Sequence, residues 1–543
     1  MRLRRTKVAK GYLLLCLHAH LPFVRHPEFP FFLEEQWLYE AILETYIPLL
    51  QMMHNLERDG VPFRLSMSIT PTLCAMLSDD LLQQRFRHHL HQLIELAEKE
   101  AQRVGEHSAF TESINMYRRK LGDARRLYED RYHSHLLQGF KQMQDSGQLE
   151  IITCGATHGF LPLMELYPAA VRAQVATAAN DYQRHFGRKP QGIWLPECAY
   201  YPGSDQILKE SGIRYFFAET HAVLHGNRRP KFGIFAPAYC PSGVATFSRD
   251  TESGKAVWSA EEGYPGDFRY REFYRDIGWD LPMDYIKDYI HPDGIRLNTG
   301  LKYYKITGKG NHKEPYSERE AWAAADSHAA NFVFNRGQQI SYLDQVFAGE
   351  RMPLITSPYD AELYGHWWYE GPTFLEQVFR HLHYDQDIVK PITAPEYLKQ
   401  YPANQVLVPS QSTWGNKGFN EVWLEGSNDW IYKHLHMAAE HMIGVAQKFQ
   451  QPSAEQERVL KQMARELLLA QSSDWAFIMK TGTHVEYAVK RTHDHLDRFH
   501  HLNHGLHHGI DFGLLHDCES KDNLFPLIDY RVYQNNAPLK VSA

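Results

Sequence analysis

The stretch YLLLCLHAHLP, residues 12–22, joins an apolar run to a polar end. Residues 12–17 are apolar, and His18 and His20 follow two positions apart. Because alternate side chains of an extended strand point to the same side, both histidines are expected on one face. Such a pair can bind a metal ion or hydrogen-bond a polar ligand, and two structural histidines are an equally simple alternative. The stretch therefore predicts a strand that ends in a histidine pair.

Six further apolar runs are bounded by turn residues and followed by polar, amphipathic stretches, at residues 63–69, 149–154, 192–195, 214–218, 353–356 and 405–408. This alternation is typical of β/α units. With residues 12–17 it gives seven strands, which predicts an α/β fold with a closed or nearly closed parallel barrel. Since the carboxyl ends of barrel strands carry the active site, the polar residues after each run form the candidate site.

Other segments interrupt or follow this pattern. Leu82, Phe86, Leu90, Leu93 and Ala97 repeat at helical spacing, which predicts a helical insertion at residues 80–145 of a barrel spanning residues 10–427. Residues 224–350 are too long for one crossover and hold Gly/Pro-rich and aromatic pieces, which favours a loop-rich lid or subdomain. Strand signals fade after residue 427, and capping boxes at Ser453 and Thr483 indicate an α-helical C-terminal domain, residues 428–543.

Composition excludes several classes of function. The 543 residues carry a formal charge of −7 without a basic tract, so nucleic acid is not an expected partner. The apolar run at residues 12–17 is too short to span a bilayer and lacks a signal-peptide cleavage site, so we expect a soluble, cytoplasmic protein without a membrane partner. Six widely spaced cysteines favour reduced thiols over disulfides or a zinc knuckle.

Two carboxylates stand at separate strand ends. Glu197, in WLPECAY, follows the run at 192–195, and Asp360 follows the run at 353–356. A solvent-facing glutamate is the ordinary interpretation of either residue alone. At two strand ends of one barrel they converge on one mouth, and a carboxylate pair is the minimum equipment for cleaving a glycosidic bond. Cys198 is an alternative nucleophile, but no Cys-His-Asn signature accompanies it.

Aromatic residues and histidines accompany these junctions. His158 follows the run at 149–154, and Asp474 lies at a helix end in SSDW, where a simple cap is the alternative. A row of tryptophans at a rim can grip sugar rings, although most aromatics are core; the tryptophans near polar junctions are Trp37, Trp279, Trp367, Trp368, Trp414 and Trp423. Seven of the 32 histidines lie between His493 and His508, where a solvated helix face is favoured over a metal site.

The junctions HAHLP, GATHGFLP, WLPECAY, SPYDAELYGHWWYEGP and SQSTWG resemble, in order, the five conserved regions of glycoside hydrolase family 57. WLPECAY, YGHWWYEGP, GYPGDFRYREFYRDIGWD and SSDW, together with the helical tail, are similar to the family's 1,4-α-glucan branching enzymes. The resemblance implies an incomplete (β/α)7 barrel with a helical insertion and an all-α C-terminal domain. It also implies glycogen-type α-glucan substrates and chain transfer without a cofactor or a metal ion.

The resemblance further assigns roles by motif. Glu197 would be the nucleophile and Asp360 the acid/base of a retaining double displacement. His18, His20 and His158 would line the donor-sugar subsite, and Trp37, Trp279, Trp414, Trp423 and Asp474 would hold glucan. A loop with a tyrosine over the site would disfavour water as acceptor, and residues 235–250 with Tyr239 are the candidate.

Three alternatives remain open at this point. An α-amylase-type hydrolase or a 4-α-glucanotransferase fits the same scaffold, because motifs report poorly on the acceptor. A metal-dependent polysaccharide deacetylase also uses strand-end histidine and aspartate, and it predicts bound zinc. A catalytically dead glycan-binding protein would keep only the tryptophans. Oligomeric state is left open, with a monomer possible.

Overall fold

The computed structural model describes residues 9–259, 262–310 and 312–534. Its first strand, β1 (Gly11–Ala19), lies inside a five-stranded sheet. The sheet order is β3-β2-β1-β8, with β9 also paired to β1, and all of its pairs are parallel. The other strands are β2 (Leu65–Ile69), β3 (Leu149–Ile152), β8 (Leu354–Asp360) and β9 (Val389–Pro391). The apolar side chains of β1 are buried, as the run at residues 12–17 predicts.

A second, four-stranded sheet has the order β4-β5-β7-β6. Its strands β4 (Gly192–Ile193), β5 (Tyr215–Ala218) and β7 (Ala245–Ser248) are parallel, and β6 (Ala238–Tyr239) is antiparallel to β7. A parallel bridge between Thr153 and Ile193 continues the first sheet into the second. The Asp250 amide donates to the Thr356 carbonyl at 2.8 Å, which brings the chain after β7 against β8.

Six of the seven predicted strands are confirmed. The run at residues 405–408 is not a strand, because it makes only one bridge, between Val406 and Tyr239. Strand β7 was not predicted, because its four residues ATFS lie inside the segment assigned as loop-rich.

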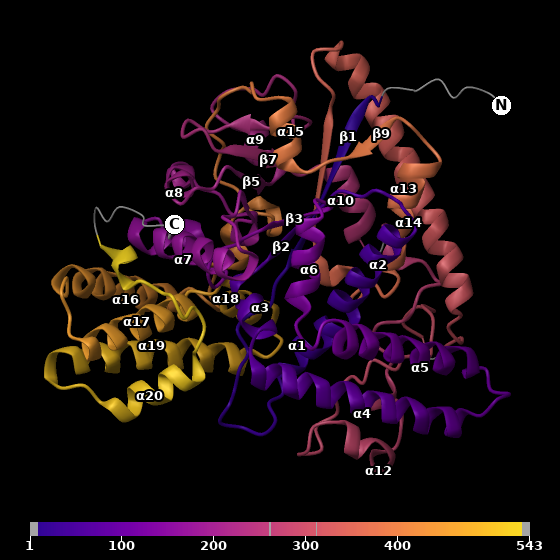
Figure 1. Cartoon of the computed structure of the whole chain (residues 1–543), viewed down its shortest axis with the longest axis horizontal. Helices are drawn as coiled ribbons and strands as arrows, with labels where there is room; N and C mark the ends of the chain where they lie inside the picture. Colours follow the sequence, from indigo (N-terminus) through magenta and orange to yellow (C-terminus); the bar gives the residue numbers. More distant parts are fainter. Residues whose placement is uncertain (1–8, 260–261, 311, 535–543) are drawn as a thin grey trace.

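Helices follow most strands and cover the sheets (Figure 1). The predicted helical region between β2 and β3 contains α4 (Asp80–Val104), α5 (Thr111–Arg125) and α6 (Leu136–Asp145), and the buried face of α4 includes the five residues whose spacing indicated a helix. The remaining helices before residue 225 are α1 (Glu35–Ala41), α2 (Ile47–Arg58), α3 (Pro71–Leu77), α7 (Pro168–Phe186), α8 (Ser204–Glu210) and α9 (Thr220–Leu224).

Residues 224–350 are less loop-rich than expected. Short helices α10 (Thr251–Trp258), α11 (Ile277–Asp280) and α12 (Met283–Ile286) lie among loops, but α13 (Glu318–Phe347) is 30 residues long. Four of its eleven buried residues are alanines and two more are Arg336 and Gly337, so its apolar periodicity is weak in the sequence. After β8 come α14 (Gly371–Tyr384) and α15 (Ala394–Gln400).

The C-terminal part is helical and lies beside the strands (Figure 1). It contains α16 (Trp430–Lys448), α17 (Ala454–Ala470), α18 (Ser473–Thr481), α19 (Val485–His508) and α20 (Phe512–Lys521). The capping box at Ser453 is confirmed. The one at Thr483 is wrong, because His484 in a left-handed conformation, with φ 55°, precedes α19. Most of the histidine run on α19 is exposed, but His495 is fully buried.

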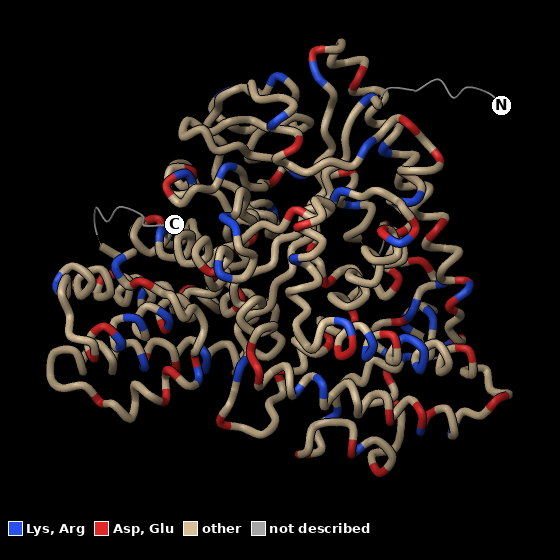
Figure 2. Tube along the Cα trace, viewed as in Figure 1, with Lys and Arg blue, Asp and Glu red and all other residues tan. Residues whose placement is uncertain are grey.

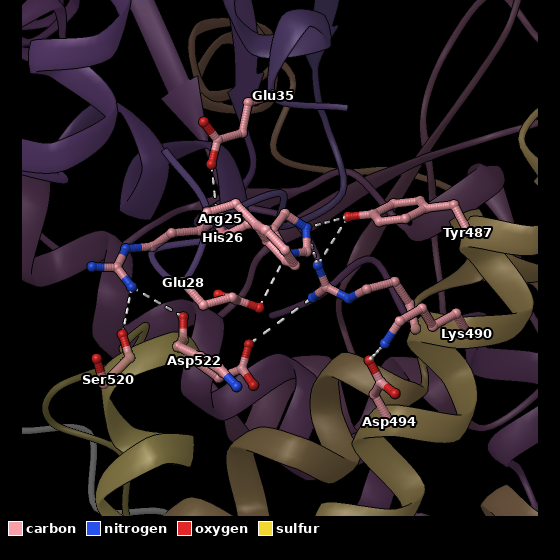
Figure 3. Close-up of polar contacts among 12 residues, drawn as sticks. Arg25, His26, Glu28, Glu35, Tyr487, Lys490, Asp494, Ser520 and Asp522 are labelled. Atoms are coloured by element: carbon pink, nitrogen blue, oxygen red, sulfur yellow. Dashed lines mark hydrogen bonds and ion pairs between the residues drawn. The ribbon is translucent and has the colours of Figure 1, made fainter. Parts of the chain in front are cut away.

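The loop after β1 joins the first sheet to these C-terminal helices (Figure 3). The His26 ring bonds the Tyr487 hydroxyl at 2.9 Å, and Arg491 donates to that hydroxyl at 3.0 Å. Arg25 donates to the Ser520 carbonyl and to Asp79 in the loop between α3 and α4. These polar contacts fix the C-terminal helices against the carboxyl-end loop that carries His20.

Acidic and basic residues are both present along α4 and α5 (Figure 2). All six cysteines are buried and unpaired, as their spacing predicts. Within the described ranges, no helix combines the length and the apolar character needed to cross a membrane.

Candidate active site

The ends of β1 and β8 bring the first candidates together. The parallel register places His18 of β1 directly beside Asp360, the last residue of β8. His18 is buried, whereas Asp360 is partly exposed. The Asp360 carboxyl makes no hydrogen bond or ion pair with any described residue, so it is free to contact a ligand.

Glu197 is held firmly just after β4. Its backbone has φ 62° and ψ 24°, a left-handed conformation that costs a residue with a side chain about 1–3 kcal/mol. One carboxylate oxygen accepts from Trp414 Nε1 at 2.8 Å and the other from Ser473 Oγ at 2.9 Å. Glu197 is only 9% exposed. Strain kept in place by two hydrogen bonds is typical of a functional group fixed for reaction.

The three predicted histidines lie together against Glu197. Nε2 of His18 is 3.0 Å from Nε2 of His158, and the His20 and His158 rings stack with centroids 3.8 Å apart. Nδ1 of His158 is 2.8 Å from the Ser473 hydroxyl that donates to Glu197. The ring of Trp194 stacks on His18 at 4.6 Å.

Asp474, on the first turn of α18, completes this cluster. His20 Nε2 lies 3.0 Å from its Oδ1. The charge and hydrogen bond of His20 lower the pKa of Asp474 to about 2 although burial opposes this. Asp474 in turn raises the pKa of His20 above its ordinary value despite burial. The pair is therefore an imidazolium and a carboxylate, and it fixes the His20 ring.

Burial dominates the protonation of the two candidate catalytic carboxyls. It raises the pKa of Glu197 to about 7, with the hydrogen bonds from Trp414 and Ser473 acting in the opposite direction. Burial also raises the pKa of Asp360 well above its usual range, and the nearby carboxylates of Glu362 and Glu197 add to the rise. Burial and neighbouring histidines hold the pKa values of His18 and His158 well below 6.5, so both rings are neutral.

Sequence reasoning did not assign Glu362, Tyr46 or Ser473 to the site. Glu362 accepts from the Tyr46 hydroxyl at 2.5 Å and from the His20 amide at 3.2 Å. Gly365 lets the loop after Glu362 pack closely against the segment that carries Tyr46, because a Cβ at Gly365 would lie 1.8 Å from the Glu44 carbonyl oxygen. Glu362, two residues after Asp360, and Ser473, beside Asp474, could have been found by their position in the same motifs.

The predicted tryptophans differ in their placement. Trp414 contacts Glu197 directly and is half-buried. Trp279 is 54% exposed, and its Nε1 donates to Asn298 Oδ1 at 2.9 Å. Trp37 is half-buried against His484 and Tyr487. Trp367, which is 58% exposed, stacks on Phe273 at the loop after Asp360.

Two of the predicted glucan contacts need correction. Trp423 is 1% exposed, with its ring stacked on Phe160, so neither face is open to a ligand. Tyr239 pairs with Ala245, the first residue of β7, and the Phe235 carbonyl accepts from Leu354, the first residue of β8. Residues 235–239 therefore lie at the amino edge of the strands, opposite the edge that carries Glu197.

Three groups of described residues have ligand atoms close enough to share a metal ion: His18, Cys154 and His158; His20, His158 and Asp474; and Glu466, His495 and Asp522. In the first, burial raises the pKa of Cys154 well above its usual range, so the thiol is not an anionic ligand. In the second, the His20–Asp474 and His18–His158 contacts already use the ligand atoms. Either group would bind metal only by giving up these hydrogen bonds.

The arrangement supports acid/base and nucleophilic chemistry on one ligand. Glu197 is fixed and ionises near neutral pH, whereas Asp360 is partly exposed and burial raises its pKa well above the usual range. Glycoside cleavage requires one carboxyl that donates a proton and a second that acts as a carboxylate, and the different environments of Asp360 and Glu197 fit these two roles. Cys198 is a weaker candidate, because burial raises the pKa of its thiol well above the usual value.

Comparison with known proteins places this site in a family. A sequence model described as glycosyl hydrolase family 57 matches residues 14–324, more than half of the chain. The chain belongs to glycosyl hydrolase family 57. A second model, 1,4-alpha-glucan branching enzyme, C-terminal, matches residues 434–533. Family membership confirms the resemblance seen in the five junction sequences.

The proteins similar to this chain carry two different names. A 1,4-alpha-glucan branching enzyme of Thermococcus kodakarensis is 33% identical over 97% of this chain and 79% of its own length. The solved branching enzyme of Pyrococcus horikoshii superposes with a TM-score of 0.86 at 33% identity, covering 97% of this chain and 98% of that one. A solved α-amylase of Thermotoga maritima superposes with a TM-score of 0.91 at 45% identity, covering 97% and 100%.

Proposed function

We propose that this protein is a 1,4-α-glucan branching enzyme. The observation that carries the proposal is that α18 lies within the segment matching the branching-enzyme C-terminal model and supplies Ser473 and Asp474 to the site. The C-terminal helices are thus part of the reaction centre. The branching enzyme of Thermococcus kodakarensis, similar over almost the whole chain, supports the same activity.

The proposed fold rests on the strand order of the two sheets. The parallel strands β8-β1-β2-β3 and β4-β5-β7, joined at Thr153 and Ile193, are consistent with an incomplete (β/α)7 barrel. Residues 10–427 would form this catalytic barrel, with the helical insertion at 80–145 and a lid or subdomain at 224–350. Residues 428–543 would form the α-helical C-terminal domain.

The first chemical step cleaves an α-1,4 bond. Protonated Asp360 gives its proton to the leaving glycosidic oxygen while the Glu197 carboxylate attacks C1 of the donor sugar. The leaving chain departs with a free 4-hydroxyl, and the donor chain stays bound to Glu197 as a glycosyl ester. Trp414 and Ser473 hold the attacking carboxylate in position.

The second step forms the branch. Asp360, now ionised, accepts the proton of a glucose 6-hydroxyl in an acceptor chain as that oxygen attacks C1 and releases Glu197. The product is an α-1,6 linkage with the original anomeric configuration. His18, His20 and His158 would bind the donor sugar, with Asp474 fixing His20 and with Trp37 and Trp279 along the glucan path.

The natural substrate and the cellular location are part of the same proposal. Glycogen or a related α-glucan would be the natural acceptor, and the buried, unpaired cysteines are consistent with a cytoplasmic location.

An α-amylase is the second candidate function, because the solved α-amylase of Thermotoga maritima is 45% identical and matches along its entire length. The catalytic steps would be the same up to the glycosyl ester, and water would then replace the 6-hydroxyl. The difference lies in the acceptor, which only product analysis separates.

The test is incubation with amylose, followed by NMR to count new α-1,6 linkages and a reducing-end assay to count hydrolysis. Branching predicts α-1,6 linkages in excess over new reducing ends, whereas an amylase gives reducing ends alone. Glu197→Gln should lower the rate by about 10⁴-fold or more with the fold intact, as removal of a nucleophile does.

Glu210→Gln is the matched control for this substitution, because Glu210 is an exposed residue of α8. It should retain wild-type branching. A Glu197→Gln enzyme that still branches amylose would remove Glu197 from the nucleophile role.

A further inference from the structure

A cavity of about 450 Å³ lies between α1, α4 and residues 289–298. Figure 1 shows α4 running along one edge of the molecule, with α12 beside it. In the described part of the chain, the lining shares no residue with the catalytic cluster around Glu197 and Asp360. Its size falls within the range of about 300–1,000 Å³ that is typical of ligand pockets. The cavity is therefore a separate candidate site.

The lining joins aromatic faces to planar polar groups. Phe31, Phe32, Tyr39 and Tyr289 supply the rings, and the polar residues are Gln36, Gln84, His88, His89, Gln92, His291 and Asn298. Ring faces cover apolar C–H surface, and amides and imidazoles both donate and accept hydrogen bonds. A ligand with apolar faces and many hydroxyl groups fits this combination.

The charge of the lining excludes an anionic ligand. The cation Arg85 is already paired with Glu35, whose two oxygens lie 2.6 and 2.8 Å from its Nη1. Burial and nearby His88 lower the pKa of His89 to about 4, so that its ring is neutral near pH 7. Phosphate or carboxylate recognition requires unpaired Arg or Lys, which this lining does not offer.

One face of α4 presents open hydrogen-bonding groups to the cavity. Gln84, His88 and Gln92 are spaced by four residues and so lie on one side of the helix. Gln84 and His88 are exposed, and neither side chain hydrogen-bonds another described residue. Gln92 reaches only the Asp288 carbonyl, at 3.4 Å. These side chains are available to a ligand.

Asn298 connects the cavity to Trp279. The Asn298 Oδ1 accepts from Trp279 Nε1 at 2.9 Å, and Asn298 is also one of the residues that line the cavity. The Trp279 ring is 54% exposed and is one of the predicted glucan contacts. Trp279 and the cavity are therefore neighbours through Asn298.

We propose that this cavity, which we name the α1–α4 groove, is a second α-glucan site that binds a run of α-1,4-linked glucose units away from the reacting bond. The inference rests on the proposed function for the identity of its ligand. Its role is to hold a long chain on the enzyme, so that long glucans are used better than short ones.

The test replaces the open face of α4 by Gln84→Ala together with His88→Ala. Alanine is the best helix former, and both residues are exposed, so α4 is expected to stay folded. The matched control is Arg87→Ala with His91→Ala, two exposed residues of α4 outside the groove lining. Each pair is made in the active enzyme and in a Glu197→Gln background, where bound maltoheptaose is not consumed.

In the Glu197→Gln background, calorimetry with maltoheptaose should find two classes of site in the parent and control but one in the groove variant. In the active enzyme, KM for amylose should rise about tenfold with kcat unchanged, the effect of losing two hydrogen-bonding side chains. Phe31→Ala, which removes a ring face instead, should give the same KM effect.

Equal stoichiometry and equal KM in groove and control variants would overturn the groove proposal while leaving branching intact. A protein that binds maltoheptaose at the groove but forms no α-1,6 linkage would overturn the proposed function instead. The two failures are therefore distinguishable.

Discussion

Two buried clusters in this molecule combine histidine with carboxylates, and they have opposite properties. In the C-terminal helices, His495 Nδ1 lies 2.7 Å from Glu466, and Asp522 is close by. All three are almost completely buried. At the strand ends, Glu197 is nearly as buried, but Asp360 beside it is partly open.

The difference lies in the guanidinium groups. Arg498 donates to Asp522 at 2.6 Å, and Arg491 donates to His495 Nε2 at 2.9 Å. Each acid of the C-terminal cluster therefore has a permanent partner in the fold: His495 for Glu466 and Arg498 for Asp522. Among the described residues, no guanidinium donates to Asp360, and Arg249 donates to Glu219 instead. A buried acid that loses its partner destabilises the fold, whereas a partly exposed acid without a partner is available for chemistry.

The sharpest test of the structural cluster is Glu466→Ala. It leaves His495 Nδ1 without its buried partner and takes one acceptor from Gln462 Nε2, which still donates to the Cys518 carbonyl. Removing one member of a buried pair costs about 3–5 kcal/mol. Urea denaturation should show this loss, whereas kcat per folded molecule should stay at the wild-type value. Glu466→Gln, which keeps the volume, should lose less. Wild-type stability with lost activity would contradict the structural role.

The catalytic cluster should respond in the opposite direction. The folded pKa of Glu197, about 7, exceeds its ordinary value of 4.5, so the folded state binds the proton more tightly than the unfolded state. This stabilises the fold at low pH, and the benefit is lost as pH rises from about 4.5 to 7. Above pH 7 the buried carboxylate costs on the order of 3 kcal/mol, because each pH unit between the two pKa values is worth about 1.4 kcal/mol.

Glu197→Gln should therefore be more stable than the wild type at pH 8, by roughly 3 kcal/mol, and equally stable near pH 4. Denaturation of both proteins across this range measures the difference. A difference that does not change with pH would show that the Glu197 carboxyl is not desolvated. Such a gain on losing the proposed nucleophile is the expected trade between stability and activity.

Much of this contrast was accessible from the sequence. His18, His20, His158, Glu197, Asp360 and Asp474 were all predicted, and the structure brings them together. For the first five the reason is that parallel strands place the residues at their ends along one edge. Asp474 and its neighbour Ser473 lie on α18, and the SSDW motif marks this segment without revealing that Ser473 contacts Glu197 across 276 positions.

The errors have equally local causes. Residues 405–408 are apolar like a strand, but they extend no ladder beyond one bridge to Tyr239. Trp423 follows a glycine-containing polar segment, which suggested a rim, yet its ring packs on Phe160. The residues next to an aromatic residue in the sequence do not reveal whether its ring is buried by distant parts of the fold.

A smaller effect is expected from Ser473→Ala. The Ser473 hydroxyl stabilises the Glu197 carboxylate by a hydrogen bond, and hydrogen bonds to charged groups contribute about 1.5–3 kcal/mol. Its loss raises the pKa of Glu197, so the acidic limb of the kcat/KM profile should move to higher pH. At pH 6 activity should fall by about tenfold or more and recover in part at pH 8.

Thr481→Ala is the control for this effect, because Thr481 lies at the other end of α18 and its hydroxyl donates to the Phe477 carbonyl. It should leave the pH profile unchanged. A uniform loss of activity at all pH values in Ser473→Ala would indicate that the hydroxyl positions Glu197 without affecting its ionisation.

The smallest effect is expected from Tyr239→Phe, which compares the two edges of the sheet. Tyr239 pairs with the first residue of β7 and lines a cavity with Gln191 and Arg214, residues that precede β4 and β5. A tyrosine that excludes water from the glycosyl ester must lie at the other edge, beyond Ser248 or Ala218. The ratio of α-1,6 linkages to new reducing ends should therefore equal that of the wild type. A rise in hydrolysis would mean that residues 235–239 leave the amino edge during turnover, because from their present place no side chain there reaches the sugar bound at Glu197.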